Sequence, residues 1–333
     1  MGNIANVSYL LCHGLAKERG IDATLAIKDT PLNQPFIYGK DNNPYNVKLQ
    51  TYRTKKEYLR VMSDAVGSDI LHIHGGISYK QLIFELLHRT RNVRHFHGSD
   101  VRNIPKDKKR LLHVGSSVVG EHVLVSTIDL LNHWGGAKYL PNPIEPTFFE
   151  SYSIEEEYSI FLPTRIEEQT KDTRMAFEAW DTIKTLDKDV LLKAMNWGED
   201  APYYRIKYKN DNRIRWLSPM SRSGIKLEME KSAVIWGQFR FSSLGLVGLT
   251  ELEAMALGKV VLMKYEAPKT LNDSPPIINA KNPDDLAHIT ANLLSQKDER
   301  SKLGQQARGW AKRHHSIEKV TQQLVETYNE IIR

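Results

Sequence analysis

Two cations near the start of the second half of the chain have the types and spacing to hold a diphosphate. In LPTRIEEQTK, residues 162–171, Arg165 comes just after a predicted strand and Lys171 stands at the predicted start of the next helix. A guanidinium binds phosphate oxygens as a fork, and an ammonium binds them as a point charge. A lysine in the first turn of a helix opposes the helix dipole, so a bound anion would relieve that conflict. The alternative is that both cations are solvated and balanced by Glu167 and Glu168.

A second candidate lies in GLVGLTELEAMALGKVVL, residues 245–262, where glycines precede an apolar helix that contains glutamates. Thr250 and Glu253 have the T-x-x-E spacing of a capping box, in which both side chains satisfy backbone N–H groups at the helix start. The same helix start could present the backbone N–H groups of Gly248, Leu249 and Thr250 to an anion. A carboxylate one turn into the helix would then accept two hydrogen bonds from a ribose diol. The residues alone leave both interpretations open.

A histidine in the first half follows a predicted strand in the same way. In HFHGSD, residues 95–100, His97 stands at the end of the strand and next to Gly98. It is either a hydrogen-bonding group aimed into a ligand site or a histidine satisfied by the local backbone.

The elements that must position these residues alternate between strand-like and helix-like runs. Such βαβ-rich halves predict an α/β protein with two Rossmann-like parallel-sheet domains that face a cleft, and ligands bind beyond the carboxyl ends of such strands. The polar, acidic, proline-marked segment 144–159 indicates the domain boundary. We expect an N-terminal domain over 1–150, a C-terminal domain over 151–315, and a helix over 316–333 that could cross back to the N-terminal domain. The expected strands are 22–27, 69–76, 92–100, 121–127, 137–143, 158–165, 189–195, 213–219, 232–239 and 260–264, and the principal helices are 4–20, 78–90, 173–185, 223–232 and 319–333.

The composition is that of an ordinary globular protein, with 41% hydrophobic and 26% charged residues in 333. No apolar run reaches the roughly 18 residues of a membrane span, and no signal-peptide pattern opens the chain, so we expect a cytoplasmic protein. The single cysteine, Cys12, excludes an internal disulfide and a cysteine-based zinc motif and is expected to be buried.

The net charge of +6 is compatible with several anionic partners. Nucleic acid is not expected, because the basic run KDKKR, residues 106–110, lacks interleaved aromatics and reads as a solvated loop. With Arg89, Arg91 and Arg94 it makes the N-terminal half basic. We therefore expect an anionic acceptor, or one at an anionic membrane surface, and a protein that could associate with that membrane.

Taken in order along the chain, these motifs resemble the retaining glycosyltransferases of the GT-B fold, specifically family GT4, which includes sucrose- and mannosyl-transferring enzymes. The resemblance covers nearly the whole chain. Its most specific pieces are ELEAMALGKVV and KLGQQARGWAKRHHSIEKV. The matching pieces are GNIANVSYLL, VRHFHGSDVR, YLPNPIE, the Arg165–Lys171 pair, ELEAMALGKVV and KLGQQARGWAKRHHSIEKV.

The resemblance implies a hexosyl transfer with retention from a nucleotide-diphosphate sugar, bound mainly by the C-terminal domain, to an acceptor sugar, lipid-linked or otherwise anionic, on the N-terminal domain. Arg165 and Lys171 match the pair that holds the diphosphate and stabilises the departing charge. His97 matches the histidine that contacts the donor sugar, and Glu253 matches the glutamate that binds the ribose. Such enzymes usually need no metal or other cofactor. The only D-x-D string, residues 187–189, is expected to be a solvated turn.

Further positions follow from the same resemblance. Gly2 and Asn3 fall in the first glycine loop, on the acceptor side. The backbone around Ser218, Pro219 and Met220, past a strand of the C-terminal domain, is the expected pocket for the base.

Two departures from the family pattern leave other functions open. The family motif is E-x7-E, and Gly245 stands where the first glutamate belongs. Relatives also begin with a strand before the glycine loop, whereas this sequence begins in the loop. A nucleotide-sugar-binding protein with degraded catalysis and a GT-B-fold nucleotide-sugar epimerase are therefore the alternatives to a glycosyltransferase.

Overall fold

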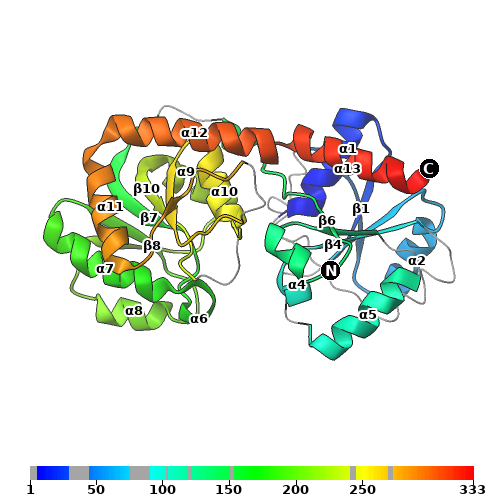
Figure 1. The fold of residues 1–333 in the computed structure, drawn as a ribbon, viewed down its shortest axis with the longest axis horizontal. Helices are drawn as coiled ribbons and strands as arrows, with labels where there is room; N and C mark the ends of the chain where they lie inside the picture. The colour runs from blue at the N-terminus through cyan, green and yellow to red at the C-terminus, as the bar shows by residue number, and fades with distance from the viewer. Residues whose placement is uncertain are drawn as a thin grey trace. The chain divides into compact units, whose positions relative to one another are not determined.

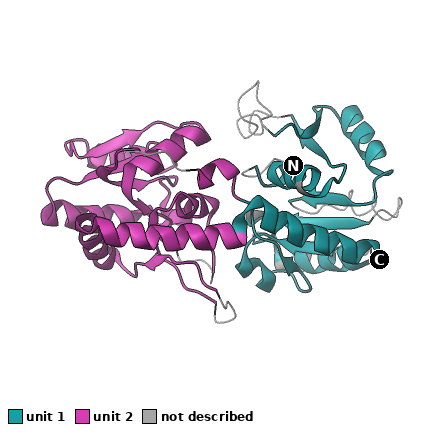
Figure 2. Ribbon diagram, turned by 90° about the horizontal axis from the view of Figure 1, so that it is seen from above, with its two compact units in different colours: residues 1–143, 315–333 teal, residues 144–314 magenta. Residues whose placement is uncertain are grey.

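The computed structural model describes residues 6–29, 45–75, 91–102, 104–118, 122–150, 154–240, 245–268 and 273–333. The chain forms two compact units, coloured in Figure 2. Unit 1 comprises Met1–Pro143 and His315–Arg333, and unit 2 comprises Ile144–His314. The division after Pro143 differs from the boundary placed at 150/151 because Ile144 and Phe148 are buried in the core of unit 2.

Unit 1 contains a four-stranded parallel sheet in the order β3-β4-β5-β6 and a separate parallel pair, β1-β2. The strands are β1 (Thr24–Lys28), β2 (Lys48–Tyr52), β3 (Leu71–His74), β4 (Asn92–Phe96), β5 (His122–Val125) and β6 (Lys138–Tyr139). The helices are α1 (Val7–Arg19), α2 (Lys55–Ala65), α4 (Ser99–Arg102), α5 (Lys106–Val118), the 3₁₀ turn η2 (Ile128–Asn132) and α13 (Ile317–Ile332).

Helices cover both faces of this sheet. On one face, α1 packs beside α13, although they lie at opposite ends of the sequence (Figure 1), and both contribute to a core with Val93 and Leu124. On the other face, α4, α5 and η2 pack on Phe96 and Val125. The alternation of side chains along β4 and β5 therefore supplies both cores.

Unit 2 is built on a six-stranded sheet in the order β12-β11-β10-β7-β8-β9, with every pair parallel. The strands are β7 (Glu157–Leu162), β8 (Leu191–Met195), β9 (Ile214–Leu217), β10 (Ser232–Trp236), β11 (Val260–Met263) and β12 (Ile278–Asn279). The helices are η3 (Pro146–Phe149), α6 (Glu168–Lys171), α7 (Thr173–Leu186), α8 (Ala201–Lys207), α9 (Arg222–Lys231), α10 (Leu249–Ala256), α11 (Pro283–Ser295) and α12 (Lys297–His315), the last ending in unit 1.

The central strands of unit 2 are buried on both faces, which is why they read as continuous apolar runs. The helices α7, α8 and α11 pack on one face, and α9, α10 and α12 pack on the other. The chain starts at β7, builds outward to β9, and then returns to add β10 on the opposite side of β7. The point between β7 and β10 is the topological switch point of a doubly wound sheet, where ligands bind beyond the strand ends.

The predicted α/β class is confirmed, with a Rossmann-like parallel sheet in each unit. Gly20 ends α1 with a left-handed φ of 61°, as its position in the sequence predicts. The prediction of a loop over residues 106–110 is wrong, because these residues form the first turns of α5. The expected helix over 78–90 lies outside the described residues. Among the described helices, none is long and apolar enough to cross a membrane.

Candidate functional site

The loops that follow β7 and β10 are joined across the switch point of unit 2. Lys171 Nζ donates to Gln238 Oε1 over 3.1 Å. The backbone N–H of Phe239 and that of Arg240 both donate to the carbonyl of Lys171, at 3.0 and 3.2 Å. This network places a lysine ammonium at the position where a doubly wound sheet binds its ligand.

The expected placement of Lys171 at the start of a helix is wrong. Lys171 is the last residue of the single-turn helix α6, and α7 begins two residues later at Thr173, after Asp172 in a left-handed conformation. At the carboxyl end of α6 the ammonium agrees with the helix dipole. The predicted conflict between charge and dipole therefore does not exist, and Lys171 is oriented through Gln238.

Arg165 lies after β7, as predicted, and its side chain is 43% exposed. Its guanidinium pairs with Glu167 at 3.1 Å and lies 5.7 Å from the ring centroid of Trp197. The interpretation of a cation balanced by a nearby glutamate thus holds for Arg165. A ligand anion would compete with an exposed ion pair, which stabilises by only about 0–1 kcal/mol.

The capping box predicted at Thr250 and Glu253 is not formed. The helix α10 begins two residues earlier than that box requires, with Gly248 rather than Thr250 at the N-cap position and no side-chain cap. The third helical residue is Glu251, and its Oε1 accepts a hydrogen bond from the backbone N–H of Gln238 at 3.0 Å. A Cβ at Gly248 would come within 2.3 Å of Oε2 of Glu251, so a larger residue here would displace that carboxylate.

These contacts bring the start of α10 to the switch point. Gln238 accepts from Lys171 through its side chain and donates to Glu251 through its backbone. The first backbone N–H groups of α10, at Leu249 and Thr250, have no partner within the helix, as at any helix N-terminus. An ammonium and a helix N-terminus therefore flank the same strand end, and both favour an anion.

Glu253 is buried, with its side chain 5% exposed, and it forms an ion pair with Arg222, the first residue of α9. Arg222 Nε lies 3.3 Å from Oε2 of Glu145, a second buried carboxylate. One guanidinium thus lies between two carboxylates. The cap interpretation of Glu253 is wrong, and the ribose interpretation requires a carboxylate that Arg222 already orients.

The loop expected to hold the base contains Pro219, which is exposed, and Met220, which packs on Gly224. It leaves the carboxyl end of β9 and leads into α9 through Ser221, whose hydroxyl accepts from the backbone of Gly224 at 3.3 Å. The loop therefore lies next to Arg222 in sequence. Gly245 has a φ of 77°, a conformation that a glutamate adopts only with strain.

In unit 1, His97 follows β4, and its ring Nε2 lies 2.9 Å from Nδ1 of His74. Its backbone N–H donates to the carboxylate of Asp100 at 2.9 Å. The ring is therefore engaged by another imidazole, in contrast to the interpretation of a histidine satisfied by local backbone. Burial lowers the pKa of His97 to about 4, and the nearby charge of Asp100 opposes that shift. Gly2 and Asn3 lie outside the described residues.

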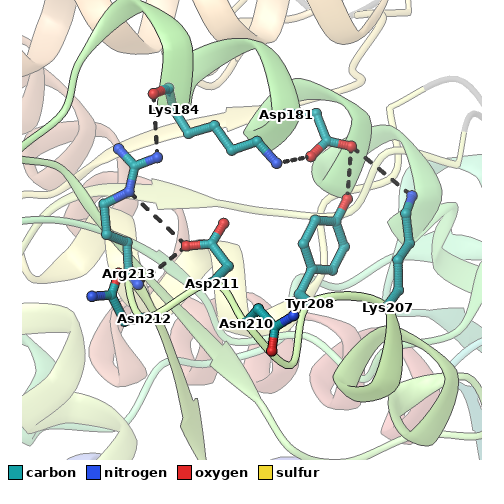
Figure 3. Close-up of a pocket in the computed structure, with 8 residues that line it drawn as sticks. All are labelled: Asp181, Lys184, Lys207, Tyr208, Asn210, Asp211, Asn212 and Arg213. Atoms are coloured by element: carbon teal, nitrogen blue, oxygen red, sulfur yellow. Dashed lines mark hydrogen bonds and ion pairs between the residues drawn. The ribbon is translucent and has the colours of Figure 1, made fainter.

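A polar pocket of about 540 Å³ lies elsewhere in unit 2 (Figure 3). It is lined by the carboxyl-terminal ends of α7 and α8 and by residues 210–213, which precede β9. Its charges are paired within the pocket: Lys184 contacts Asp181 at 2.5 Å, and Arg213 lies 4.0 Å from Asp211. Because it lies at the amino end of a strand and its charges are satisfied, we interpret it as a structural feature.

Sequence reasoning missed three residues of this arrangement: Gln238, Glu251 and Arg222. Gln238 falls inside the predicted strand 232–239, whereas the observed strand ends at Trp236, and its position near the carboxyl end of that run is the only signal that could have identified it. Glu251 was overlooked because the helix start was placed two residues too late. Nothing in the sequence pairs Arg222 with Glu253, since they lie on different helices.

The sequence matches no protein-family model and no curated protein. Solved structures are similar over the whole chain. Anabaena HepE in complex with UDP and glucose has a TM-score of 0.76 at 12% identity, covering 99% of this chain and 97% of that chain. A glycosyltransferase from Rickettsia africae has a TM-score of 0.73 at 16% identity, covering 100% and 96%. A candidate UDP-N-acetylglucosamine 2-epimerase from Listeria monocytogenes has a TM-score of 0.62 at 14% identity, covering 99% and 94%. The likeness extends over both units and identifies the fold as GT-B.

Proposed function

We propose that the chain is a retaining glycosyltransferase that transfers a sugar from a nucleotide-diphosphate sugar to an acceptor. The observation that supports this most is the connection of Lys171, Gln238 and Glu251 across the switch point of unit 2. It directs an ammonium and the N-terminus of α10 toward one anion. The Anabaena structure is a complex with UDP and glucose, which supports the same ligand class. The Rickettsia protein is described as a glycosyltransferase, which supports the same activity.

In this proposal, unit 2 binds the donor. Lys171 and the N–H groups of Leu249 and Thr250 hold the diphosphate, and Arg165 exchanges Glu167 for a phosphate oxygen. Negative charge grows on the diphosphate as the sugar leaves, so fixed cations stabilise the transition state more than the bound donor. Cations and helix N–H groups can supply this stabilisation without a metal ion at the diphosphate.

The nucleoside is assigned to the α9–α10 side of the same sheet edge. The buried carboxylate of Glu253 would accept from the ribose diol, and the backbone of Pro219 and Met220 would contact the base. Arg222 holds Glu253 in place. His97, in unit 1, is assigned to contact with the donor sugar.

Unit 1 is assigned to the acceptor, an anionic or lipid-linked sugar, and the protein to the cytoplasmic face of an anionic membrane. Fewer basic residues support this assignment than the sequence indicated, because Arg94 is fully buried in β4 and does not reach the surface. Among the described residues of this basic set, Arg91 and Arg110 are exposed and Lys109 is half-buried. Co-sedimentation with liposomes that depends on anionic lipid and falls with salt is the expected result.

The test of the proposed function combines ligand binding with turnover. Nucleoside diphosphates should raise the melting temperature of the full chain, since ligands that bind the native state stabilise it. Nucleotide sugars with lipid-linked sugar acceptors should release nucleoside diphosphate, with the anomeric configuration of the donor kept in the product. Adding Mg²⁺ or Mn²⁺ should not raise the rate. Absence of any thermal shift across the panel would overturn the proposal.

An epimerase is the second candidate, favoured by the Listeria structure named above. An epimerase converts the nucleotide sugar itself and needs no acceptor, so acceptor-independent conversion would identify it. A binding protein with degraded catalysis would show the thermal shift without nucleoside diphosphate release. The positive φ of Gly245 supports this third possibility, because the loop conformation disfavours the glutamate that the family has there.

A further inference from the structure

Four histidines lie on one face of the unit 1 sheet. In the parallel register of β3 and β4, His74 is opposite His95. Side chains alternate along a strand, so His72 and His74 share a face with His95 and with His97, which follows β4. This face is the one covered by α1 and α13.

The four rings form a close array. The ring centroids are 4.5 Å apart between His72 and His74, and 4.4 Å apart between His95 and His97. His95 is fully buried, and the others are half-buried. One ring nitrogen from each of His72, His74 and His95 lies within 4.8 Å of the other two.

The hydrogen bonds of the array leave specific nitrogens unused. His72 Nδ1 lies 2.6 Å from the hydroxyl of Tyr328 on α13, and His74 Nδ1 lies 2.9 Å from His97 Nε2. Within the described part of the chain, His72 Nε2 is buried without a hydrogen-bond partner, and the buried ring of His95, which meets the backbone of Leu140, leaves at least one of its nitrogens without one. Buried polar atoms in folded proteins nearly always have a hydrogen-bond partner, so unpartnered nitrogens gathered in one place call for an explanation.

We propose that His72, His74 and His95 bind a divalent transition-metal ion, for which zinc is the best match. Neutral imidazole is a preferred ligand of Zn²⁺, Cu²⁺ and Ni²⁺, whereas Ca²⁺ and Mg²⁺ take oxygen ligands. Three histidines leave a fourth coordination position for water or another ligand, as in three-histidine zinc centres. The nearby carboxylate of Asp100 is directed to the backbone N–H groups of His97 and Gly98, so it does not complete an oxygen site.

The remaining contacts have the form of an outer coordination shell. Histidines that bind a metal through one nitrogen usually donate the other N–H to a fixed acceptor, which sets the ring orientation. Tyr328 and His97 stand in that relation to His72 and His74. Tetrahedral zinc with bonds of 2.0–2.1 Å places its ligand nitrogens roughly 3.3 Å apart. The three imidazoles, whose nitrogens lie within 4.8 Å of one another, would therefore rotate toward a common centre when the ion binds.

The ion would join β3, β4 and, through Tyr328, the C-terminal helix α13. The helix α13 is distant in sequence from both strands, because it returns to unit 1 only after unit 2 has been completed. Metal binding to the folded state would raise the stability of unit 1 by mass action. This proposal does not depend on the transferase activity, because it concerns binding and folding alone.

The test uses the tag-free full chain, freed of metal with a chelator and then titrated with ZnCl₂ in a calorimeter. We expect one Zn²⁺ per chain and a higher melting temperature, and Co²⁺ in place of zinc should give the strong visible absorption of tetrahedral cobalt. Replacing His95 or His74 by Ala should abolish all three signals. His288→Ala is the matched control, since His288 is an exposed histidine of α11 whose Nδ1 contacts the carbonyl of Asp284 at 2.9 Å.

Tyr328→Phe keeps the ring and removes only the hydroxyl that orients His72, so it tests the site even if the alanine variants fail to fold. Loss of an outer-shell partner should weaken Zn²⁺ binding about 10- to 100-fold. The proposal is overturned if the wild type binds no Zn²⁺, or if Tyr328→Phe binds it as tightly as the wild type. It is also overturned if His288→Ala loses Zn²⁺ binding while the variants of His74 and His95 keep it.

Discussion

Arg222 and Glu253 form an ion pair between the first turn of α9 and the middle of α10 in unit 2. Because Arg222 also contacts Glu145 at 3.3 Å, the pair is part of a chain of two carboxylates around one guanidinium. Glu253 is therefore both the structural partner of Arg222 and the candidate ligand of the ribose. Measurements of stability and of nucleotide affinity can separate these two roles.

Glu253→Gln is expected to lower both stability and nucleotide affinity. The amide retains one acceptor for Arg222 but loses the charge, which should cost about 2 kcal/mol of unfolding free energy, as for a hydrogen bond to a charged group. A ribose diol donates two hydrogen bonds, so the affinity for a nucleoside diphosphate should fall about tenfold, or near 1.4 kcal/mol. Urea unfolding and calorimetric titration measure the two effects.

The control for Glu253 uses the 2′,3′-dideoxy nucleotide, which should bind the wild type and the Gln variant almost equally. If the variant loses stability but keeps its affinity for the ordinary nucleotide, Glu253 is only the partner of Arg222, and the ribose assignment fails.

Arg165→Ala is expected to lower turnover by roughly 10² or more while weakening donor binding much less. The reason is that the guanidinium meets a charge that grows in the transition state, like an oxyanion-hole donor. Steady-state rates and donor affinities check this. Arg174→Ala is the control, because Arg174 is a nearby cation on α7 that is 64% exposed and makes only long ion pairs. A wild-type rate in Arg165→Ala would remove this residue from the mechanism.

Gln238→Glu is expected to weaken nucleoside diphosphate binding by tenfold or more without unfolding the protein. The new carboxylate would stand 3.1 Å from the Lys171 ammonium and neutralise it, and it would repel the diphosphate. Gln238→Met removes the acceptor without adding charge, so it should have a smaller effect. Equal affinities in the wild type and Gln238→Glu would show that Lys171 does not meet the diphosphate.

The loss of unfolding free energy at acid pH is expected to depend on Glu157. Burial raises the pKa of this carboxyl, but the buried Lys193 ammonium at 2.8 Å outweighs it, and the net pKa lies below the ordinary value of 4.5. The folded state therefore binds fewer protons than the unfolded state below pH 4.5, and this stabilisation is lost as the pH falls through the folded pKa. Unfolding free energies measured between pH 6 and 3 should fall less steeply in Glu157→Gln. The exposed Glu178→Gln of α7 should keep the wild-type slope, and an unchanged slope in Glu157→Gln would contradict the prediction.

Local patterns in the sequence determined the fold class and the succession of strands along the chain. Short apolar runs such as SAVIW and VVLM are typical of strands buried on both faces, and the glycine after α1 ends that helix in a left-handed conformation. The residues placed after strand ends, His97, Arg165 and Lys171, were found by the same logic, because the carboxyl ends of parallel strands share one edge. Their chemical roles remain predictions.

Tertiary structure decided which of these residues have partners and which partners they have. The pairing of Lys171 with Gln238 depends on β10 being laid beside β7, a crossover that no local pattern encodes. The sequence pattern placed the helix start at Thr250, which is the better local cap, whereas the observed N-cap is Gly248. In the folded chain the carboxylate of Glu251 accepts from the backbone N–H of Gln238, a contact between distant segments. The histidine array likewise forms only when β3 and β4 align in register and α13 brings Tyr328 onto them. Propensity and spacing act over a few residues, whereas these contacts join segments that only the packing of sheets and helices brings together.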